Sequence, residues 1–347
     1  MAQELQHSIA SICPQTSLST KTLSACQCVA LFAGGLVFMD VPLSGEVKKK
    51  LCFTRALDEV GRCLFVFVLI VFLLPSLVIV YVGLLVHKCL CGPSKDAYFA
   101  KLNSVVRRSF AISCRVALFL CPWIRIRNNS SVDLQRFMSK SGRPCFVVSN
   151  HTSFFDIIVL VLVLPLVVVR KVKMFVSHNL MKAPVLGHIV YAMGHLSVPF
   201  NNTDDREAKE KLKSVLSKRQ QEFEDHVSAG GHGGWFPEGR LNFGDNHRLQ
   251  QYRAGGFTSA VRVDAELWCV ALCGNAVSWP AKAPVGGKPA RIGAEISCLC
   301  ESTHDFLTAT AAPGSDEVAK SVILANRSQE LTQKLLDQLT SEGYVGK

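Results

Sequence analysis

The sequence predicts an α/β fold with a mostly parallel central sheet flanked by helices, preceded by an N-terminal membrane helix region. One observation is an uncharged apolar run long enough to cross a bilayer. Another is the alternation, from about residue 123 onward, of short apolar segments bounded by turn residues with longer helix-favouring segments. The third is composition: 49% of the residues are hydrophobic and 19% are charged, whereas a soluble domain usually has about 25% charged residues.

The apolar run covers Leu64–Val86, and its 23 residues match the ~20 that a helix needs to cross the hydrocarbon core. We assign residues 1–92 to a membrane-anchoring region with its main span at 64–86. A shorter apolar stretch, Cys26–Met39, suits either a second marginal membrane segment or an interfacial helix. Basic residues are slightly more numerous after the span than before it, which favours a cytosolic C-terminal side.

Residues 93–121 form a basic connector. Arginines at 107, 108 and 115 alternate there with apolar residues, as in an amphipathic helix. Such a helix can lie among lipid headgroups, or it can pack on the following domain; the sequence leaves both alternatives open.

An α/β domain is assigned to residues 122–312. Trp123–Ile126 and Pro144–Ser149 are predicted strands, because both are short, apolar and bounded by polar or turn residues. Ile157–Val169 is too short to span a bilayer and predicts a buried helix, giving way near Pro165 to a strand that ends about Phe175. The other predicted elements are a helix over Asp204–Val227, strands over Gly233–Phe236 and Leu267–Gly274, and an amphipathic C-terminal helix (Asp316–Leu339) within residues 313–347.

The net charge of +11 favours anionic partners. Nucleic acid is not expected among them, because the basic residues are scattered and not interleaved with aromatics. The 14 cysteines lack the C-x-x-C spacing of zinc sites. We therefore expect reduced thiols that act as small hydrophobic side chains, and no metal site.

One candidate site is Asn150-His151-Thr152-Ser153-Phe154-Phe155-Asp156, which directly follows a predicted strand. A carboxylate at Asp156 can accept a hydrogen bond from one imidazole nitrogen of His151 and fix its tautomer. The other nitrogen is then a base for a substrate hydroxyl. Alone the pair is common, because Asp156 can also serve simply as a first-turn helix residue.

A second segment, Trp235-Phe236-Pro237-Glu238-Gly239-Arg240-Leu241, also follows a predicted strand. Its polar groups are expected at the carboxyl end of that strand, where α/β domains bind ligands. Arg240 offers a guanidinium fork for a phosphate, and Glu238 can orient that arginine or bond a glycerol hydroxyl. Alone, this segment could equally be a surface turn with a solvated ion pair.

Together, N-H-x-x-x-x-D and F-P-E-G-R about 80 residues later resemble the phospholipid/glycerol acyltransferase superfamily, most of all its lysophosphatidic acid acyltransferases. The resemblance covers roughly residues 123–279. It places His151 and Asp156 on the catalytic dyad and Phe236, Pro237, Glu238 and Gly239 on the acceptor-binding motif. Arg240 and Arg253 are further candidates for substrate binding.

The resemblance implies transfer of a fatty acyl group from acyl-CoA or acyl carrier protein to the free hydroxyl of a lysophospholipid, giving phosphatidic acid from 1-acylglycerol 3-phosphate. It implies acyl-CoA as a co-substrate, with no cofactor or metal, and membrane lipids as partners. An integral membrane protein of the endoplasmic reticulum or another internal membrane, with a cytosolic catalytic domain, is expected.

The sequence departs from the family pattern at two phosphate-binding arginines. Phe200 and Leu241 stand where those arginines are usual. Arg240 from a shifted position, and Lys182 or Arg253, are the candidate replacements. The acceptor therefore stays open: glycerol 3-phosphate or a lysophospholipid with a headgroup are alternatives, as is an inactive lipid-binding membrane protein of the same fold.

Overall fold

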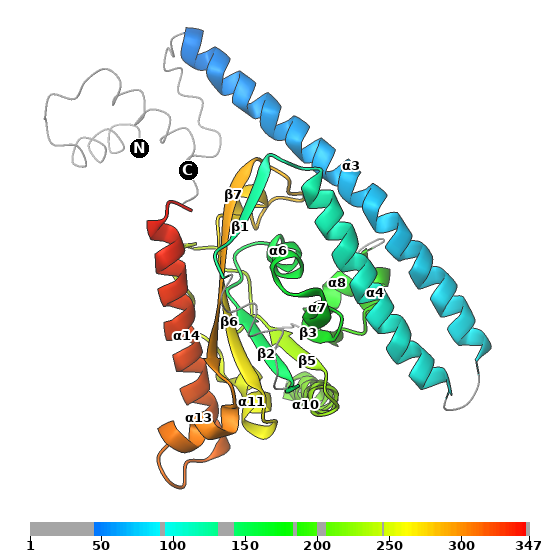
Figure 1. Cartoon of the computed structure of the whole chain (residues 1–347), viewed down its shortest axis with the longest axis vertical. Coiled ribbons are helices and arrows are strands. Elements are labelled where there is room, and N and C mark those ends of the chain that lie inside the picture. The colour runs from blue at the N-terminus through cyan, green and yellow to red at the C-terminus, as the bar shows by residue number, and fades with distance from the viewer. Residues whose placement is uncertain are drawn as a thin grey trace, which may run out of the picture. The chain divides into compact units, whose positions relative to one another are not determined.

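The computed structural model describes residues 45–90, 94–130, 142–182, 186–199, 206–244 and 246–344 (Figure 1). The stretch Cys26–Met39, with its proposed second membrane segment, lies outside these residues. The helices are α3 (Gly45–Cys89), α4 (Ser94–Phe119), α6 (Asp156–Val163), α7 (Leu166–Val169), α8 (His178–Met181), α9 (Leu186–Ala192), α10 (Arg206–Ser228), α11 (Thr258–Arg262), α12 (Asn275–Ser278), α13 (Thr303–Thr310) and α14 (Glu317–Ser341), with a 3-10 turn at Ala254–Phe257.

Seven strands in the described part of the chain form one sheet in the order β1-β7-β6-β2-β5-β3-β4. Neighbouring strands are parallel except for the antiparallel pair β6–β7. The predicted α/β fold with a mostly parallel sheet is therefore confirmed. The strands are β1 (Ile124–Asn128), β2 (Cys145–Ser149), β3 (Val172–Ser177), β4 (Leu196–Val198), β5 (His232–Trp235), β6 (Glu266–Cys273) and β7 (Ala290–Cys300).

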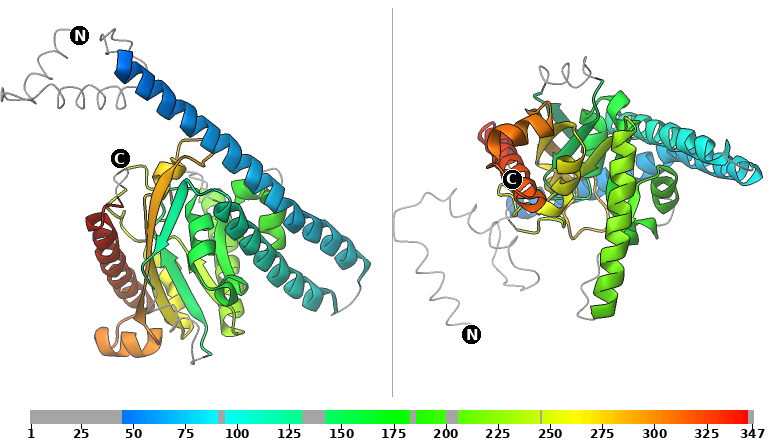
Figure 2. Two further views of the ribbon diagram at one scale, coloured as in Figure 1. Left: turned by 45° about the horizontal axis from the view of Figure 1, so that its top comes forward. Right: turned by 90° about the horizontal axis from the view of Figure 1, so that it is seen from below.

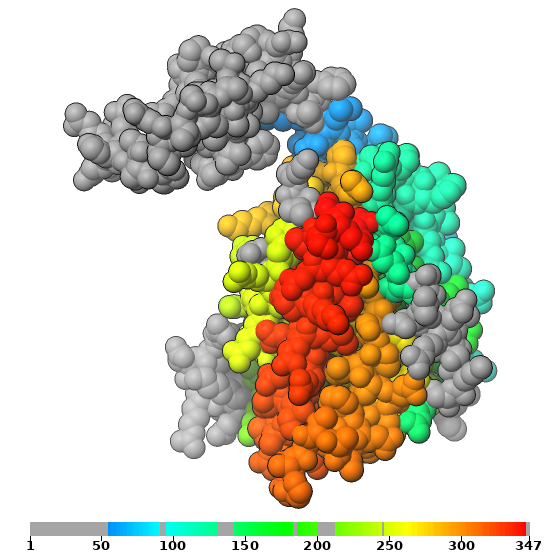
Figure 3. All heavy atoms as spheres, turned by 60° about the vertical axis from the view of Figure 1, so that its left-hand side comes forward, coloured from blue at the N-terminus to red at the C-terminus, as the bar shows by residue number. Residues whose placement is uncertain are grey.

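The central strand β2 is buried on both faces, which explains its unbroken apolar sequence. Successive side chains point to opposite faces, so Cys145 and Val147 join one hydrophobic cluster whereas Phe146 and Val148 join the other. The first cluster includes residues of α3, α4, α6 and α9, and the second includes residues of α10, α13 and α14. Helices thus cover both faces of the sheet (Figures 1 and 2), and Figure 3 shows α14 and α13 on the surface of the second face.

Helix α3 contains the predicted span and is much longer than that span. Its section from Arg55 to Cys89 is long and apolar enough to cross a membrane. Phe65, Leu73 and Val80 are buried against the rest of the domain, whereas Phe67 and Val78 keep about 65% and 61% of their surface exposed. One stripe of α3 therefore packs on protein, and the other sides are apolar and uncovered.

Helix α4, the predicted connector, runs beside α3 (Figures 1 and 2). Ser76 of α3 bonds the hydroxyls of Ser109 and Ser113 across this helix pair. Arg107 and Arg115 of the connector both point into the domain. Arg107 donates hydrogen bonds to the carbonyl oxygens of Arg170 and Met193. The sequence left open whether this helix lies among lipid headgroups or packs on the following domain. In the structure α4 packs on the domain.

Arg115 donates to the carbonyl of Leu164, at the end of α6. Because the last carbonyls of a helix have no partner within it, Arg115 and Arg107 act as caps of neighbouring elements.

The predicted helix in the apolar run Ile157–Val169 is α6, and it ends before Pro165 as expected. The strand expected directly after Pro165 is wrong there: a second short helix, α7, covers Leu166–Val169, and β3 begins only at Val172. Side chains of the run help to line a small apolar cavity of about 40 Å³. That space is far too small for a fatty acyl chain, so this run fills the core in the described state.

Candidate active site

The two predicted segments lie next to each other, at the carboxyl ends of paired strands. β2 and β5 are parallel neighbours, with Val148 opposite Trp235. Asn150 and His151 follow β2, and Phe236 follows β5. Because parallel strands end at the same edge of a sheet, the segments converge there.

His151 and Asp156 are in direct contact. The Nδ1 atom of His151 lies 2.9 Å from Oδ2 of Asp156, and the carboxyl is fully buried whereas the imidazole keeps 18% exposure. Oδ2 also accepts the backbone N–H groups of Thr152 (2.8 Å) and Ser153 (3.0 Å). Hydrogen bonds to the charged form stabilise an ionised carboxylate in a buried site, so Asp156 is suited to bind the N–H of a neighbouring imidazole.

The orientation of the imidazole is fixed from a second side. The ring of Phe236 stacks on it with centroids 4.0 Å apart and planes 12° from parallel. With Nδ1 bonded to Asp156, Nε2 makes no hydrogen bond to any residue that the structure describes. One nitrogen is therefore held and the other is available to a substrate.

Glu238 is buried and braces the loop that carries His151. Oε1 accepts the backbone N–H of His151 at 2.8 Å, and Oε2 accepts that of Gln250 at 3.1 Å. Burial raises the pKa of Glu238, against the lowering effect of these two hydrogen bonds. The printed partners of this carboxyl are therefore backbone N–H groups, and Arg240 donates to Gln250 instead.

Pro237 and Gly239 shape the turn after β5. The N–H of Gly239 bonds the carbonyl of Phe236 at 3.0 Å, closing a four-residue turn with proline at its second position. Gly239 has φ +70°, a conformation that favours glycine, and a Cβ there would meet the side chain of Arg253. The turn thus places Arg253 beside the F-P-E-G-R segment.

Arg240 and Arg253 are both exposed. Arg240 donates from Nε to Gln250 at 3.1 Å, and the backbone N–H of Arg253 bonds the carbonyl of Pro237 at 2.9 Å. The structure brings all the predicted site residues to one edge of the sheet. Lys182 is the residue directly after α8, beyond the end of β3, and Phe200 is outside the described residues.

Three asparagines to which the sequence analysis gave no role hold this site together. The buried amide of Asn150 donates to the carbonyl of Leu272 and accepts its N–H, which ties the end of β2 to β6. The backbone N–H of Asn242 donates to the carbonyl of His151 at 2.7 Å. Asn275, at the end of β6, contacts Asp156 and Thr152. These roles have no sequence signal, because each depends on contact between distant segments.

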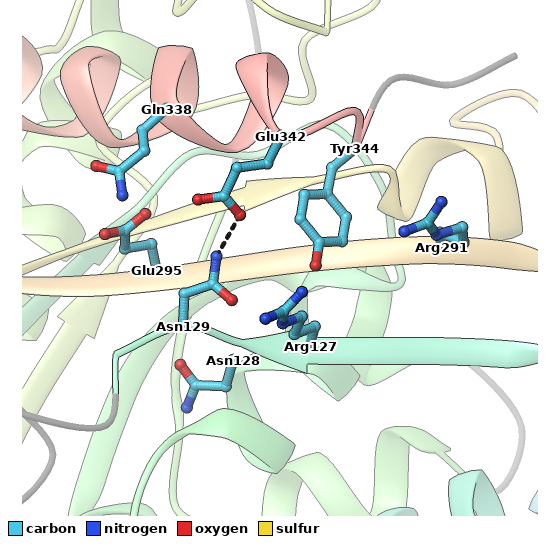
Figure 4. A pocket seen from close by; sticks show the side chains of 8 residues that line it. All are labelled: Arg127, Asn128, Asn129, Arg291, Glu295, Gln338, Glu342 and Tyr344. Atoms are coloured by element: carbon cyan, nitrogen blue, oxygen red, sulfur yellow. Dashed lines mark hydrogen bonds between the residues drawn. The ribbon is translucent and has the colours of Figure 1, made fainter.

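A larger crevice of about 650 Å³ lies elsewhere, between β1, β7 and the carboxyl end of α14. Figure 4 shows Glu342 bonded there to Asn129, at 2.6 Å, with Tyr344 between Arg127 and Arg291. His151, Asp156 and the F-P-E-G-R segment do not line this crevice. The dyad itself lies at a shallow, partly exposed edge.

Comparison with known proteins agrees with this geometry. Residues 126–272 match the acyltransferase family model, and this stretch contains both the dyad and the F-P-E-G-R segment. No curated protein sequence gives a significant match. Among solved structures, the chain is similar to the crystal structure of the 1-acyl-sn-glycerophosphate (LPA) acyltransferase PlsC from Thermotoga maritima. The TM-score is 0.56 at 13% identity, over 83% of this chain and 98% of that one, a likeness of fold.

Proposed function

We propose that this chain, whose residues 126–272 match the acyltransferase family model, acylates a lysophospholipid. The donor is a thioester, acyl-CoA or acyl carrier protein, and the favoured acceptor is 1-acylglycerol 3-phosphate, which yields phosphatidic acid. The observation that carries the proposal is the buried contact of 2.9 Å between Nδ1 of His151 and Asp156, which leaves Nε2 for a substrate.

In this reaction His151 is the general base. The acceptor hydroxyl donates its proton to Nε2 as its oxygen attacks the thioester carbonyl. Asp156 stabilises the imidazolium that forms and keeps its ring in place. When the C–S bond breaks, the imidazolium returns the proton to the leaving thiolate. The hydroxyl supplies the nucleophile, so the reaction needs no covalent enzyme intermediate.

The backbone N–H groups nearest the dyad do not bind the oxyanion. That of His151 is bonded to Glu238, and those of Thr152 and Ser153 are bonded to Asp156. Their contribution is to fix the dyad before substrate arrives, which removes a reorganisation cost from the reaction step.

A phosphate on the acceptor is proposed to bind Arg240 and Arg253. Both guanidinium groups are exposed beside the turn that holds Phe236 against His151. Arginine binds phosphate through two parallel N–H groups. Arg240 and Arg253 can therefore supply the charges that the family usually takes from positions 200 and 241.

The uncovered apolar sides of α3 support membrane association, because the acceptor and product both partition into the bilayer. The positive surplus adds attraction to anionic headgroups, about 1 kcal/mol per basic residue near the surface. We propose an internal membrane such as the endoplasmic reticulum, with the catalytic domain cytosolic. Asn150 of the sequon Asn150-His151-Thr152 is fully buried with its amide bonded, so the folded domain cannot be glycosylated there.

The test is acyl transfer by the full chain in membranes. Release of CoA from acyl-CoA would be measured with lysophosphatidic acid, glycerol 3-phosphate and headgroup-bearing lysophospholipids. His151→Ala and Asp156→Asn should lose roughly 10²- to 10⁴-fold in kcat, whereas the exposed His304→Ala should match the wild type. A wild type with no turnover above His151→Ala on any acceptor would refute the proposal.

The same assay separates the remaining alternatives. If glycerol 3-phosphate or a headgroup-bearing lysophospholipid gave the highest kcat/KM, the acceptor would be corrected while the dyad chemistry stood. Tight binding of lysophospholipid without any CoA release would instead indicate an inactive lipid-binding protein of the same fold.

A further inference from the structure

The two oxygens of the Asp156 carboxylate are held by different parts of the chain. Oδ2 accepts three donors from its own loop: Nδ1 of His151 and the backbone N–H groups of Thr152 and Ser153. Oδ1 accepts the side-chain amide of Asn275. Asn275 is 119 residues away in the sequence, and it lies beyond the end of the stretch, 126–272, that matches the acyltransferase family model.

The orientation of the Asn275 amide follows from its neighbours. Its nitrogen faces Oδ1 of Asp156 and, at 2.8 Å, the hydroxyl oxygen of Thr152. Turning the amide over would set its oxygen against a carboxylate oxygen, and two acceptors repel. The NH₂ group therefore donates one hydrogen to each partner.

The backbone holds Asn275 at this point. It begins α12 directly after Gly274, which has φ +85° and packs so tightly on the carbonyl of Arg291 that a Cβ would clash there. Asn275 and Asp156 are 1% and 0% exposed. A buried carboxylate oxygen that loses its donor keeps the cost of desolvation without compensation.

We infer that Asn275 is a positioning residue of the dyad: its amide keeps Asp156 ionised and directed at His151. As a role in catalysis, this rests on the proposed function. Hydrogen bonds to the ionised form lower the proton affinity of a carboxyl. Replacing Asn275 should therefore make the dyad bind a proton more tightly.

The experiment compares the pH dependence of kcat/KM for wild type, Asn275→Leu and Asn275→Asp in membranes. The acid limb, on which His151 becomes protonated, should move to higher pH by about one unit in Asn275→Leu. It should move further in Asn275→Asp, because the new carboxylate adds negative charge. At the optimum, kcat should fall about 10- to 100-fold while the KM values for both substrates change little.

Other charges around the dyad stay the same in these variants. Glu238 faces both His151 and Asp156, and Arg240 and Arg253 flank the same loop. The matched control is Asn103→Leu on α4, another buried asparagine. It should lower the thermal unfolding midpoint and leave the acid limb unmoved.

A second readout does not need acyl transfer. Diethyl pyrocarbonate modifies neutral imidazole, so its rate at His151, followed by mass spectrometry of the peptide, reports the proton affinity of the dyad directly. Thr152→Val keeps the backbone N–H and removes the hydroxyl that accepts the second hydrogen of the Asn275 amide. It should therefore shift the pH dependence of the modification rate in the same direction, but by less. This variant serves if the Asn275 variants fail to fold.

The inference would be overturned if the pH dependence of the His151 modification rate were the same in Asn275→Leu, or in Thr152→Val in its place, as in the wild type. Asn275 would then be a structural residue. A shifted His151 profile in a chain that transfers no acyl group would support the positioning of the dyad and refute the proposed function. The two failures are therefore distinguishable.

Discussion

The rings of His151 and Phe236 stack face to face, with centroids 4.0 Å apart and planes 12° from parallel. The first belongs to the loop after β2 and the second to the turn after β5, so the contact joins the two sequence motifs through the reactive ring itself. The aromatic side chain at position 236 therefore limits the rotation of the imidazole, while Asp156 holds Nδ1.

Replacing Phe236 by leucine should lower kcat about 3- to 10-fold, because an aromatic pair contributes about 0.5–1.5 kcal/mol beyond its buried area. Steady-state kinetics on the best acceptor would measure it. Phe175→Leu is the matched control, since Phe175 packs on Phe223, in the hydrophobic cluster on the other face of the sheet. It should reduce thermal stability and leave kcat close to wild type. Equal kcat losses in the two variants would argue against a specific role for the stack.

Glu238→Gln should lower the free energy of unfolding by about 2 kcal/mol and also reduce kcat. A glutamine has one carbonyl oxygen, whereas Glu238 accepts two backbone N–H groups, from His151 and Gln250; one buried donor would face the new NH₂ group. Chemical denaturation and kinetics would measure the two effects. Glu342→Gln, which alters an exposed hydrogen bond to Asn129, should change stability by less than about 0.5 kcal/mol. A fully active, stable Glu238→Gln would contradict the bracing role.

Arg253→Gln and Arg240→Gln should each lower kcat/KM for 1-acylglycerol 3-phosphate roughly 10- to 100-fold, the loss of one charge-assisted hydrogen bond. The same variants should have little effect on a neutral acceptor such as a monoacylglycerol, because that substrate carries no phosphate. Arg327→Gln, an exposed arginine paired with Glu330 on α14, controls for net charge. Equal losses on charged and neutral acceptors would place both arginines outside the phosphate site.

The parts of the fold predicted correctly are those with a strong local pattern. β2 has an unbroken apolar sequence because both of its faces are buried, and α10 and α14 are long and free of glycine and proline. Two strands were missed. β4 has only three residues, and β7 combines an arginine, a glycine and a glutamate with an antiparallel pairing to β6. Their strand character comes from the neighbouring strands.

The residues of the site divide in the same way, into those with a local sequence pattern and those without one. The sequence points to His151 and Asp156 because the N-H-x-x-x-x-D pattern occurs together with the F-P-E-G-R segment about 80 residues later. It is silent on Asn275, which reaches Asp156 from 119 residues away, and on the two backbone donors that Glu238 accepts. Glutamate beside arginine suggests an ion pair locally. Only the pairing of β2 with β5 shows that the backbone of His151 is the nearer partner.

Among the described residues, burial lowers the pKa of three histidines, which makes stability depend on pH; one of them is His226, whose pKa falls to about 4. His195 accepts the N–H of Met174, and His232 that of Cys145; burial lowers the pKa of His195 to about 3 and of His232 to about 4. An unfolded histidine has a pKa of about 6.5, so below that pH the unfolded chain binds more protons. Stability should fall from about pH 6.5 to about pH 4, by up to about 1.4 kcal/mol per pH unit for each histidine. His232→Asn keeps an acceptor and should flatten the dependence of the thermal midpoint on pH, whereas the exposed His304→Asn should not. Parallel curves for His232→Asn and wild type would disprove this account.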